Sequence, residues 1–230
     1  MALTGANLVD EVQALTGRTG SDTVLCDDTR VTRWLNEGQR DIVEKIPGMH
    51  AVTFKNTTSV DTTAKLSYPL TDWTVGDATS QTICSVWKVA YMDGVDSIDL
   101  RYIHVDEFDD AYTDPTHTDY PTDRPTVWTR RGNAIEMYPL PSSSYYNKDI
   151  RVDGDFYPED FTTNDADSSD LSQCDDGLIY YAVARSWGAI GDEVKAKIWE
   201  GKYEDWVEKR KAKNDIIPGW SGSMFEDAME

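Results

Sequence analysis

The sequence predicts an α+β protein: a small helical bundle formed by N- and C-terminal helices, a large inserted antiparallel β-rich (sandwich-like) region, and an extended C-terminal arm. Apolar residues recur at helical spacing near both ends of the 230-residue chain and alternate with polar residues through its middle. The final stretch is rich in Gly, Ser and Pro and has no apolar period. The expected parts are two halves of the bundle at 1–50 and 177–214, a β-rich domain at 51–158, an acidic loop at 159–176, and an arm at 215–230.

The N-terminal segment is expected to form two helices. Leu8, Val12 and Leu15 fall at i, i+4 and i+7, and a longer apolar stripe at helical spacing follows a loop rich in Gly, Ser and Asp. Residues 27–29 supply capping chemistry before the second helix, and Pro47-Gly48 ends it. The stripe consists of Val31, Trp34, Leu35, Ile42, Val43 and Ile46.

The middle of the chain shows the alternation typical of strands. Breakers such as Asp93-Gly94 and Pro139-Leu140-Pro141 separate the runs, and residues 131–133 are expected to form a tight hairpin turn. One or two helical turns are expected to interrupt the strands at 105–112. The alternating residues are Val52 and Phe54; Leu66, Tyr68 and Leu70; Ile83, Val86, Trp87 and Val89; Ile98, Leu100 and Tyr102; Val127 and Trp128; Ile135 and Met137; Ile150, Val152 and Phe156.

Helical periodicity returns after the acidic loop. Two helices are expected, joined near residues 188–192, and Ser172 with Asp175 resembles a capping box at the start of the first. Neither helical pair has enough apolar surface to fold alone, so we expect the two ends of the chain to close as one bundle, with the β region as a second lobe. The apolar-face residues are Leu178, Tyr181, Ala182, Arg185 and Ile190, then Val194, Ile198, Trp199, Tyr203, Trp206 and Val207.

The large aromatic side chains fall into two groups. Tryptophans at helical spacing are expected to anchor the core of the bundle rather than to form a platform for a ligand. Trp220 and Phe225 lie instead in a segment that cannot build its own core, so they either fold back or insert into a partner, and aromatic residues are the usual anchors of interfaces. We therefore favour docking on a partner.

The chain is strongly acidic, and the acidity is unevenly distributed. Asp and Glu number 42 against 22 Lys and Arg, which gives a formal net charge of −20. Residues 51–176 hold 24 acids and 9 bases, whereas 1–50 hold 8 and 5, and 177–230 hold 10 and 8. Proteins bind duplex DNA mainly by neutralising phosphates with Lys and Arg. This composition predicts a poor DNA binder, although it does not prevent the protein from standing beside DNA.

No catalytic motif is recognisable. The three histidines, His50, His104 and His117, lie in different expected elements, and no H-E-x-x-H, P-loop or G-x-G-x-x-G sequence occurs. Residues 219–222 (GWSG) only superficially resemble a nucleophile elbow, because they follow a helix rather than a strand. We expect ordinary surface or sheet histidines and no serine hydrolase.

Metal binding is a weaker alternative. Residues 165–176 place oxygen ligands at a spacing similar to that of a calcium loop, but Asp170 stands where Gly is required and Asp176 where Glu is required. The acids of 106–110 could also hold a divalent ion, yet adjacent acids on a short helix usually form a solvated face. No metal site is therefore expected.

The remaining features suggest an intracellular chain without a membrane span. No apolar run approaches the ~20 residues of a transmembrane helix. Residues 1–5 have neither a basic nor an apolar region typical of targeting signals. Cys26, Cys84 and Cys174 are widely spaced and lack a C-x-x-C pattern, which predicts reduced, inert thiols.

Six segments carry a further signal when they are taken in order. They are 34–42 (WLNEGQRDI), 66–70 (LSYPL), 124–128 (RPTVW), 133–141 (NAIEMYPLP), the helical stretch 180–187 and the helical stretch 195–206. Together they resemble the adaptor proteins of tailed bacteriophages, also called head-tail connector or head-completion proteins. The resemblance spans most of residues 4–210.

The resemblance implies a ring of copies, commonly twelve, beneath the portal of the capsid, with DNA passing through the central channel without specific binding. It implies that the helical core packs side by side in the ring, the β insertion faces outward or toward the tail, and a C-terminal arm docks into the portal. The implied partners are the portal protein, neighbouring copies, and the next tail or neck protein, such as a stopper, nozzle or fibre. The implied location is the head-tail junction of the virion, after synthesis in the host cytoplasm. The large, unusually acidic insertion departs from the family's pattern.

The leading hypothesis is thus a non-enzymatic structural adaptor with no cofactor. The alternatives are a β-sandwich binding module that recognises a tail fibre, spike or carbohydrate through exposed Tyr and Trp, and, third, a metal-dependent enzyme. The residues expected to form the bundle core are Trp34, Leu35, Ile42, Trp187, Trp199 and Trp206. Those expected to dock the arm on the portal are Ile216, Ile217, Pro218, Trp220 and Phe225.

Overall fold

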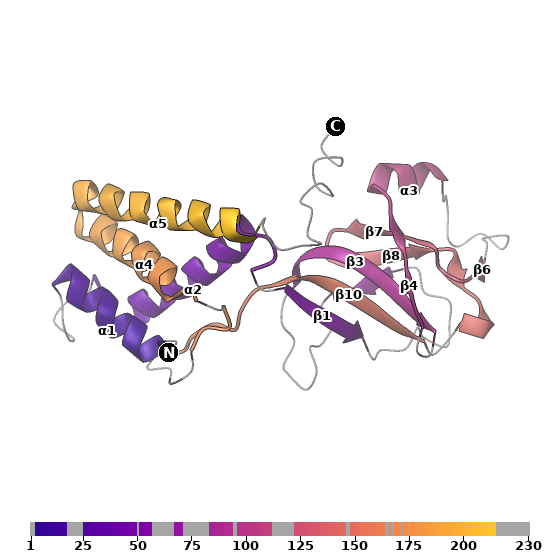
Figure 1. The fold of residues 1–230 in the computed structure, drawn as a ribbon, viewed down its shortest axis with the longest axis horizontal. Helices are drawn as coiled ribbons and strands as arrows, with labels where there is room; N and C mark the ends of the chain where they lie inside the picture. Colours follow the sequence, from indigo (N-terminus) through magenta and orange to yellow (C-terminus); the bar gives the residue numbers. More distant parts are fainter. Residues whose placement is uncertain are drawn as a thin grey trace. The chain divides into compact units, whose positions relative to one another are not determined.

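The chain has the α+β fold expected from its sequence (Figure 1). The computed structural model describes residues 3–17, 25–49, 51–56, 67–70, 83–93, 96–111, 122–145, 148–163, 166, 168–171 and 173–214. They form two compact units. The helical unit contains the described residues up to Met49 and those from Tyr157 onward, and the β unit is Ala51–Phe156.

The helical unit contains four helices from both ends of the chain. They are α1 (Gly5–Thr16), α2 (Asp28–Lys45), α4 (Asp175–Ile190) and α5 (Glu193–Asn214). Helix α4 lies at the centre, because α1, α2 and α5 all pack against it. The four helices share an apolar interior that includes Leu8, Val12, Leu35, Ile42, Leu178, Ala182 and Val207, each fully buried.

Local capping explains where these helices begin and end. Asp27 accepts a hydrogen bond from the backbone N–H of Arg30 at 2.8 Å, as the sequence predicted for the start of α2. Gly17 and Gly191 adopt left-handed backbone conformations at the ends of α1 and α4, where a side chain would be strained. The short link at Gly191 therefore turns α5 back along α4.

The capping box expected at Ser172 and Asp175 is wrong. Cys174 occupies the N-cap position of α4 and makes no side-chain capping bond, so Asp175 is the first helical residue rather than the third. The Asp175 carboxylate instead accepts a hydrogen bond from the Leu3 N–H at 3.0 Å. Ser172 lies outside the described residues. The acid therefore joins α4 to the segment before α1.

The β unit contains two four-stranded sheets. The first has the order β1 (Ala51–Asn56), β10 (Asp149–Phe156), β3 (Ile83–Asp93), β4 (Asp96–Asp99), and its pairs are antiparallel. The second has the order β2 (Ser67–Pro69), β8 (Ala134–Tyr138), β7 (Val127–Arg131), β5 (Arg101–Tyr102). Strands β7 and β8 form the hairpin predicted at residues 131–133, with Gly132 in the left-handed conformation.

One hydrophobic core is shared by the two sheets. Tyr68, Trp128, Ile135 and Met137 come from the second sheet and are buried against residues of the first, among them Val89 and Phe156. Inner faces of two sheets that bury a common core define a sandwich. The β unit is therefore sandwich-like, as the alternating pattern indicated.

Not every strand pair is antiparallel. Strand β5 runs parallel to β7, and β6 (Thr122–Asp123) runs parallel to β9 (Leu140–Pro141). Parallel neighbours require a long crossover connection, and helix α3 (Val105–Ala111) lies between β5 and β7 in the chain. The predicted helical interruption at 105–112 is thus the element that makes the parallel pair possible.

Candidate functional site

Two amides of α2 hold the segment that follows the β unit. Asn36 donates to the carbonyl of Phe161 at 3.0 Å and accepts from the Phe161 N–H at 2.8 Å. Gln39 donates to the carbonyl of Glu159 at 3.2 Å and accepts from the Ser169 hydroxyl at 2.6 Å. These bonds provide hydrogen-bond partners for backbone groups that lie outside helices and strands. The amide pair therefore fixes the position of the acidic loop on the helical unit.

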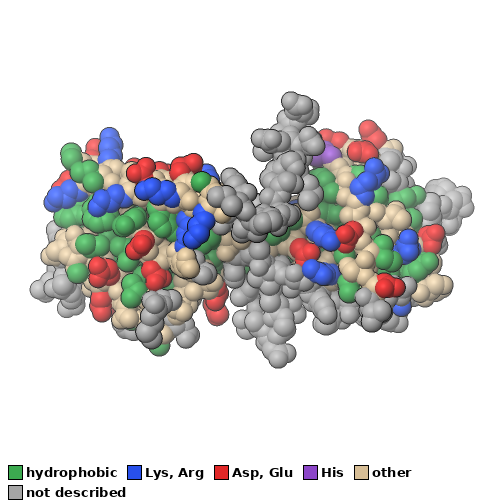
Figure 2. Space-filling model, viewed as in Figure 1, with side chains coloured by type: hydrophobic (Ala, Val, Ile, Leu, Met, Phe, Trp, Pro, Cys, Tyr) green, Lys and Arg blue, Asp and Glu red, His purple; other side chains and the backbone are tan. Residues whose placement is uncertain are grey.

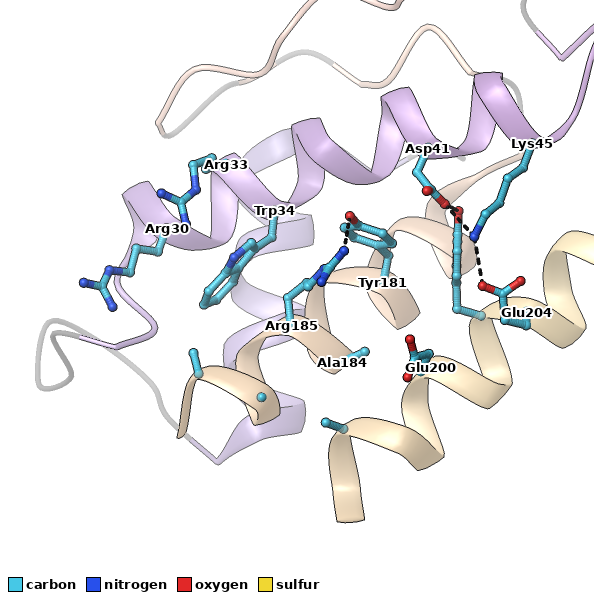
Figure 3. A pocket seen from close by; sticks show the side chains of 14 residues that line it. Arg30, Arg33, Trp34, Asp41, Lys45, Tyr181, Ala184, Arg185, Glu200 and Glu204 are labelled. Atoms are coloured by element: carbon cyan, nitrogen blue, oxygen red, sulfur yellow. Dashed lines mark hydrogen bonds and ion pairs between the residues drawn. The ribbon is translucent and has the colours of Figure 1, made fainter. Parts of the chain in front are cut away.

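A groove of about 640 Å³ lies between α2, α4 and α5 (Figure 3). Its lining combines aromatic rings and small residues with charges of both signs. The residues that line it are Arg30, Arg33, Trp34, Asp41, Lys45, Tyr181, Ala184, Arg185, Gly188, Ala189, Ala196, Glu200, Tyr203 and Glu204. No His, Cys or Ser belongs to this lining, so it lacks the usual nucleophile–base pair of covalent catalysis.

One end of the groove is a charge network that joins α2 to α5. The Lys45 ammonium lies 3.1 Å from Asp41 and 2.8 Å from Glu204. The buried Tyr203 donates its hydroxyl hydrogen bond to the same Asp41 carboxylate. Burial, followed by this bond, raises the pKa of Tyr203 well above its ordinary value. Lys45 is partly desolvated, but its hydrogen bonds to Glu204 and Asp41 outweigh that effect and raise its pKa.

The other end of the groove is basic. Arg30, Arg33 and Arg185 contribute to its lining beside Trp34 (Figure 3). Arg185 lies over the Tyr181 ring at 4.9 Å and donates to the Tyr181 hydroxyl at 2.9 Å. A cation over an aromatic face is held in place without losing contact with water. This end can accept acidic or aromatic groups, and the contact between Arg185 and Tyr181 lies within α4.

The three tryptophans of α4 and α5 are half-buried. Lys195 lies 3.8 Å from the centroid of the Trp187 ring, and Lys202 lies 3.6 Å from that of Trp199. Arg210 covers Trp206 at 5.6 Å. The expected core residues from α2 differ, since Trp34, Leu35 and Ile42 are buried. The tryptophans thus lie at the boundary of the core, with basic side chains over their outer faces.

Helix α5 exposes large apolar side chains on the face turned away from α4. Val194 is 72% exposed and Ile198 is 56% exposed, and the spacing of four residues places both on one stripe. Basic side chains surround them, and Lys and Arg gather along α5 in the view of Figure 2. Exposed apolar groups rimmed by charge are typical of a contact surface. The apolar period of the sequence predicted that both residues lie on the apolar faces of helices, so their exposure was not predicted.

Two of the acids of α3 contact neighbouring side chains. Asp109 pairs with Arg131, which also lies 3.1 Å from Glu136. Asp106 lies 3.3 Å from His104 Nδ1. The hydrogen bonds that the Arg131 guanidinium donates to Asp109, and then to Glu136, raise its pKa. These carboxylates are therefore engaged in structural pairing at one edge of the β unit.

The described residues contain neither a metal-binding cluster nor a membrane-spanning helix. No group of three His, Cys, Asp or Glu side chains there is placed to hold a metal ion. None of the described helices has the length and apolar character needed to cross a membrane. Ser169 of the calcium-like segment bonds Gln39, while Asp165 and Asp167 lie outside the described residues.

The residues expected to dock the arm are Ile216, Ile217, Pro218, Trp220 and Phe225, and all five lie outside the described residues. Docking by this segment therefore stays a prediction. The structure brings together a different set on the helical unit: the amide pair of α2, the groove network and the exposed stripe of α5. A signal for Gln39 was present, since this amide lies four residues after Leu35, at a position of the apolar stripe.

Comparison with known proteins agrees with this architecture. Residues 3–219 match the family described as SU10 adaptor protein. No curated protein matches the chain. The family match includes the helices from both ends of the chain and the inserted β unit between them. The chain therefore belongs to the SU10 adaptor protein family, a family of phage adaptor proteins.

Proposed function

We propose that this chain is a non-enzymatic structural adaptor of a tailed phage that assembles as a ring under the capsid portal. The ring joins head to tail at the head-tail junction of the virion and lets DNA pass through its channel. Its partners are the portal protein, identical neighbours in a ring that is expected to be a dodecamer, and the next tail or neck protein. Family membership supports the adaptor role, and the surface of the helical unit supports assembly.

The observation that carries the proposal is the exposed stripe of α5. A 22-residue helix that packs mainly against α4 leaves a long face available, and here that face carries Val194 and Ile198. Burying a large aliphatic side chain contributes about 1.5–3 kcal/mol, so water-exposed positions of this kind favour association. A repeated contact through such a face would build an oligomer of identical copies.

The charge of the chain supports a channel that does not retain DNA. With a net charge of −20, a ring of copies presents an acidic field to the phosphate backbone. Tight duplex binding depends on releasing counterions through basic contacts, which such a field opposes. Passage without binding is the behaviour that a conduit requires.

The test is assembly with the portal protein of the same phage. The purified chain, alone and mixed with portal, is measured by native mass spectrometry and negative-stain electron microscopy. A ring seated on the portal, with no retention of duplex DNA at ~0.15 M salt, is the expected result. A chain that never oligomerises, with or without portal, contradicts the proposal; a ring that binds duplex tightly contradicts its channel part.

A second candidate function rests on the β unit. Tyr102 is 45% exposed and packs edge-on against Trp128 at a centroid distance of 4.9 Å. An exposed aromatic supported by a buried one suits recognition of a tail fibre, spike or carbohydrate. Removing the Tyr102 ring should leave assembly on the portal intact and abolish such binding, which distinguishes the two functions.

A further inference from the structure

Helices α1 and α5 present complementary surfaces on different sides of the helical unit. We propose that α5 of one copy packs antiparallel against α1 of the next copy, so that apolar residues of the two helices meet and opposite charges pair. This inference rests on the proposed ring and names the surfaces through which identical neighbours meet. The occupant of the exposed α5 stripe is therefore a second copy of this chain.

The α5 patch is defined as Val194, Lys197, Ile198, Gly201 and Lys202, which are all exposed. They recur at three- and four-residue intervals and so form one stripe. Gly201 has no atom within 4 Å of the place where a β-carbon would stand, which leaves room for a helix to approach closely. Lys202 lies over Trp199, and Lys197 makes no ion pair with the described residues. The patch is therefore apolar and basic.

The α1 patch is defined as Asn7, Asp10, Glu11, Ala14 and Leu15, which are also exposed. These residues lie opposite the buried face of α1 that carries Leu8 and Val12. Helix α1 contains no Lys or Arg, and neither Asp10 nor Glu11 forms an ion pair within the described parts of the chain. Leu15 is 38% exposed. This patch is apolar and acidic, and it complements the α5 patch in charge.

The two patches match in length and order. Each spans nine residues, which is about 12 Å of helix at 1.5 Å per residue. In an antiparallel arrangement Leu15 meets Val194 and Ile198, while Asp10 and Glu11 meet Lys197 and Lys202. A parallel arrangement would also bring Asp10 level with Lys197, but it would place Asn7 against Val194 and Leu15 against Lys202. Only the antiparallel arrangement pairs apolar with apolar and acid with base.

One copy cannot satisfy both patches itself. Helix α4 packs between α1 and α5, which lie on opposite sides of it in Figure 1. A contact between two different surfaces is heterologous, and it forms a ring when the rotation closes. Five residues on each side are far fewer than the ~20–30 of a standard stable interface. A single contact should therefore be weak. Closure of a ring, for example on a portal template, would stabilise the assembly by adding many such contacts.

Cysteine cross-linking of the full chain tests this contact. In the double variant Leu15→Cys, Ile198→Cys, mild oxidation should produce a ladder of disulfide-linked oligomers on a non-reducing gel. The single variants are the controls, because each can form no more than a dimer through its new cysteine. A double variant that gives no more than the single variants overturns the inference. Circular dichroism of each variant establishes that the fold is intact.

A charge exchange provides a second readout. Lys197→Glu with Lys202→Glu should weaken association about tenfold, because each opposite-charge pair becomes a repulsion. Adding Asp10→Lys and Glu11→Lys should restore it. The matched control, Lys209→Glu with Lys213→Glu, makes the same charge change on α5 outside the patch and should have little effect. Equal weakening by both pairs, without restoration, overturns the inference.

The outcomes separate this inference from the function on which it rests. If the wild-type chain forms rings on the portal but neither the cross-linking nor the charge exchange gives the expected result, the α5–α1 contact is wrong and the proposed ring is still supported. If the wild-type chain forms no oligomer under any condition, both are wrong.

Discussion

The ring of Trp206 lies against Gly177, so closely that a β-carbon at residue 177 would be 2.7 Å from Trp206 Cε3. This contact joins the first turn of α4 to the second half of α5, where Trp206 also stacks on Tyr203 at a centroid distance of 6.5 Å. The absence of a side chain at 177 therefore sets the distance between two helices of the helical unit. Gly188, the other glycine of α4, has no such role.

Gly177→Ala is expected to destabilise the helical unit by about 1–3 kcal/mol. The added methyl group must displace the Trp206 ring, and overpacking of this kind costs more than the gain in helix propensity from alanine. Chemical denaturation followed by far-ultraviolet circular dichroism measures the change.

The matched control for this substitution is Gly188→Ala in the same helix. Nothing lies within 4 Å of the β-carbon position at 188, so alanine there should stabilise the protein by up to about 1 kcal/mol. Equal effects of the two substitutions would contradict the packing argument.

Asn36→Ala should cost about 2–3 kcal/mol. The substitution removes the acceptor of the Phe161 N–H and the donor to the Phe161 carbonyl, so both backbone groups of this buried residue lose their partners. Denaturation of the purified variant measures the loss. Arg40→Ala is the control on the same helix, because Arg40 makes only an exposed ion pair with Asp160 of the same segment and should cost about 0–1 kcal/mol. A smaller loss for Asn36→Ala than for Arg40→Ala would be incompatible with the role of the amide.

The arrangement of helices and strands was predictable because the apolar periods change sharply at both ends of the β unit. Asp27 and Gly132 marked a helix start and a hairpin correctly, since capping and turn chemistry act over a few residues. The exposure of Ile198 and the half-burial of Trp199 were not predictable, because an apolar period does not say whether the face lies in the core or awaits a partner. The parallel pairing of β5 with β7 was not predictable either, because it depends on long-range packing.

Stability should fall as the pH rises from about 9 toward 12. Burial raises the pKa of the Cys174 thiol to about 12, and burial also raises that of Tyr203. At pH values below the ordinary pKa of both groups, the folded and unfolded chains bind the same protons, so the contribution of these groups to stability is fully present. At higher pH the unfolded chain loses its protons first, which favours unfolding with a slope of up to about 1.4 kcal/mol per pH unit for each group.

Cys174→Ala tests the source of this pH dependence. The variant should lose the thiol's part of the slope between pH 9 and 12, and denaturation at several pH values measures it. The alanine also removes buried volume, which lowers stability equally at every pH and does not alter the slope. Parallel stability curves for wild type and variant would refute the assignment to Cys174.

Truncation after Lys213 should abolish binding to the portal while leaving the helical unit folded. The removed segment carries Ile216, Trp220 and Phe225, and large apolar groups in a segment rich in Gly and Ser have no core of their own to fill. The helical unit keeps its buried α5 residues, Tyr203 and Val207, so its thermal midpoint should change by only a few degrees. Co-sedimentation with portal measures binding, and the double substitution Trp220→Ala, Phe225→Ala in the full-length chain should give the same loss. Undiminished binding by the truncated chain would place the portal contact on the folded units instead of the arm.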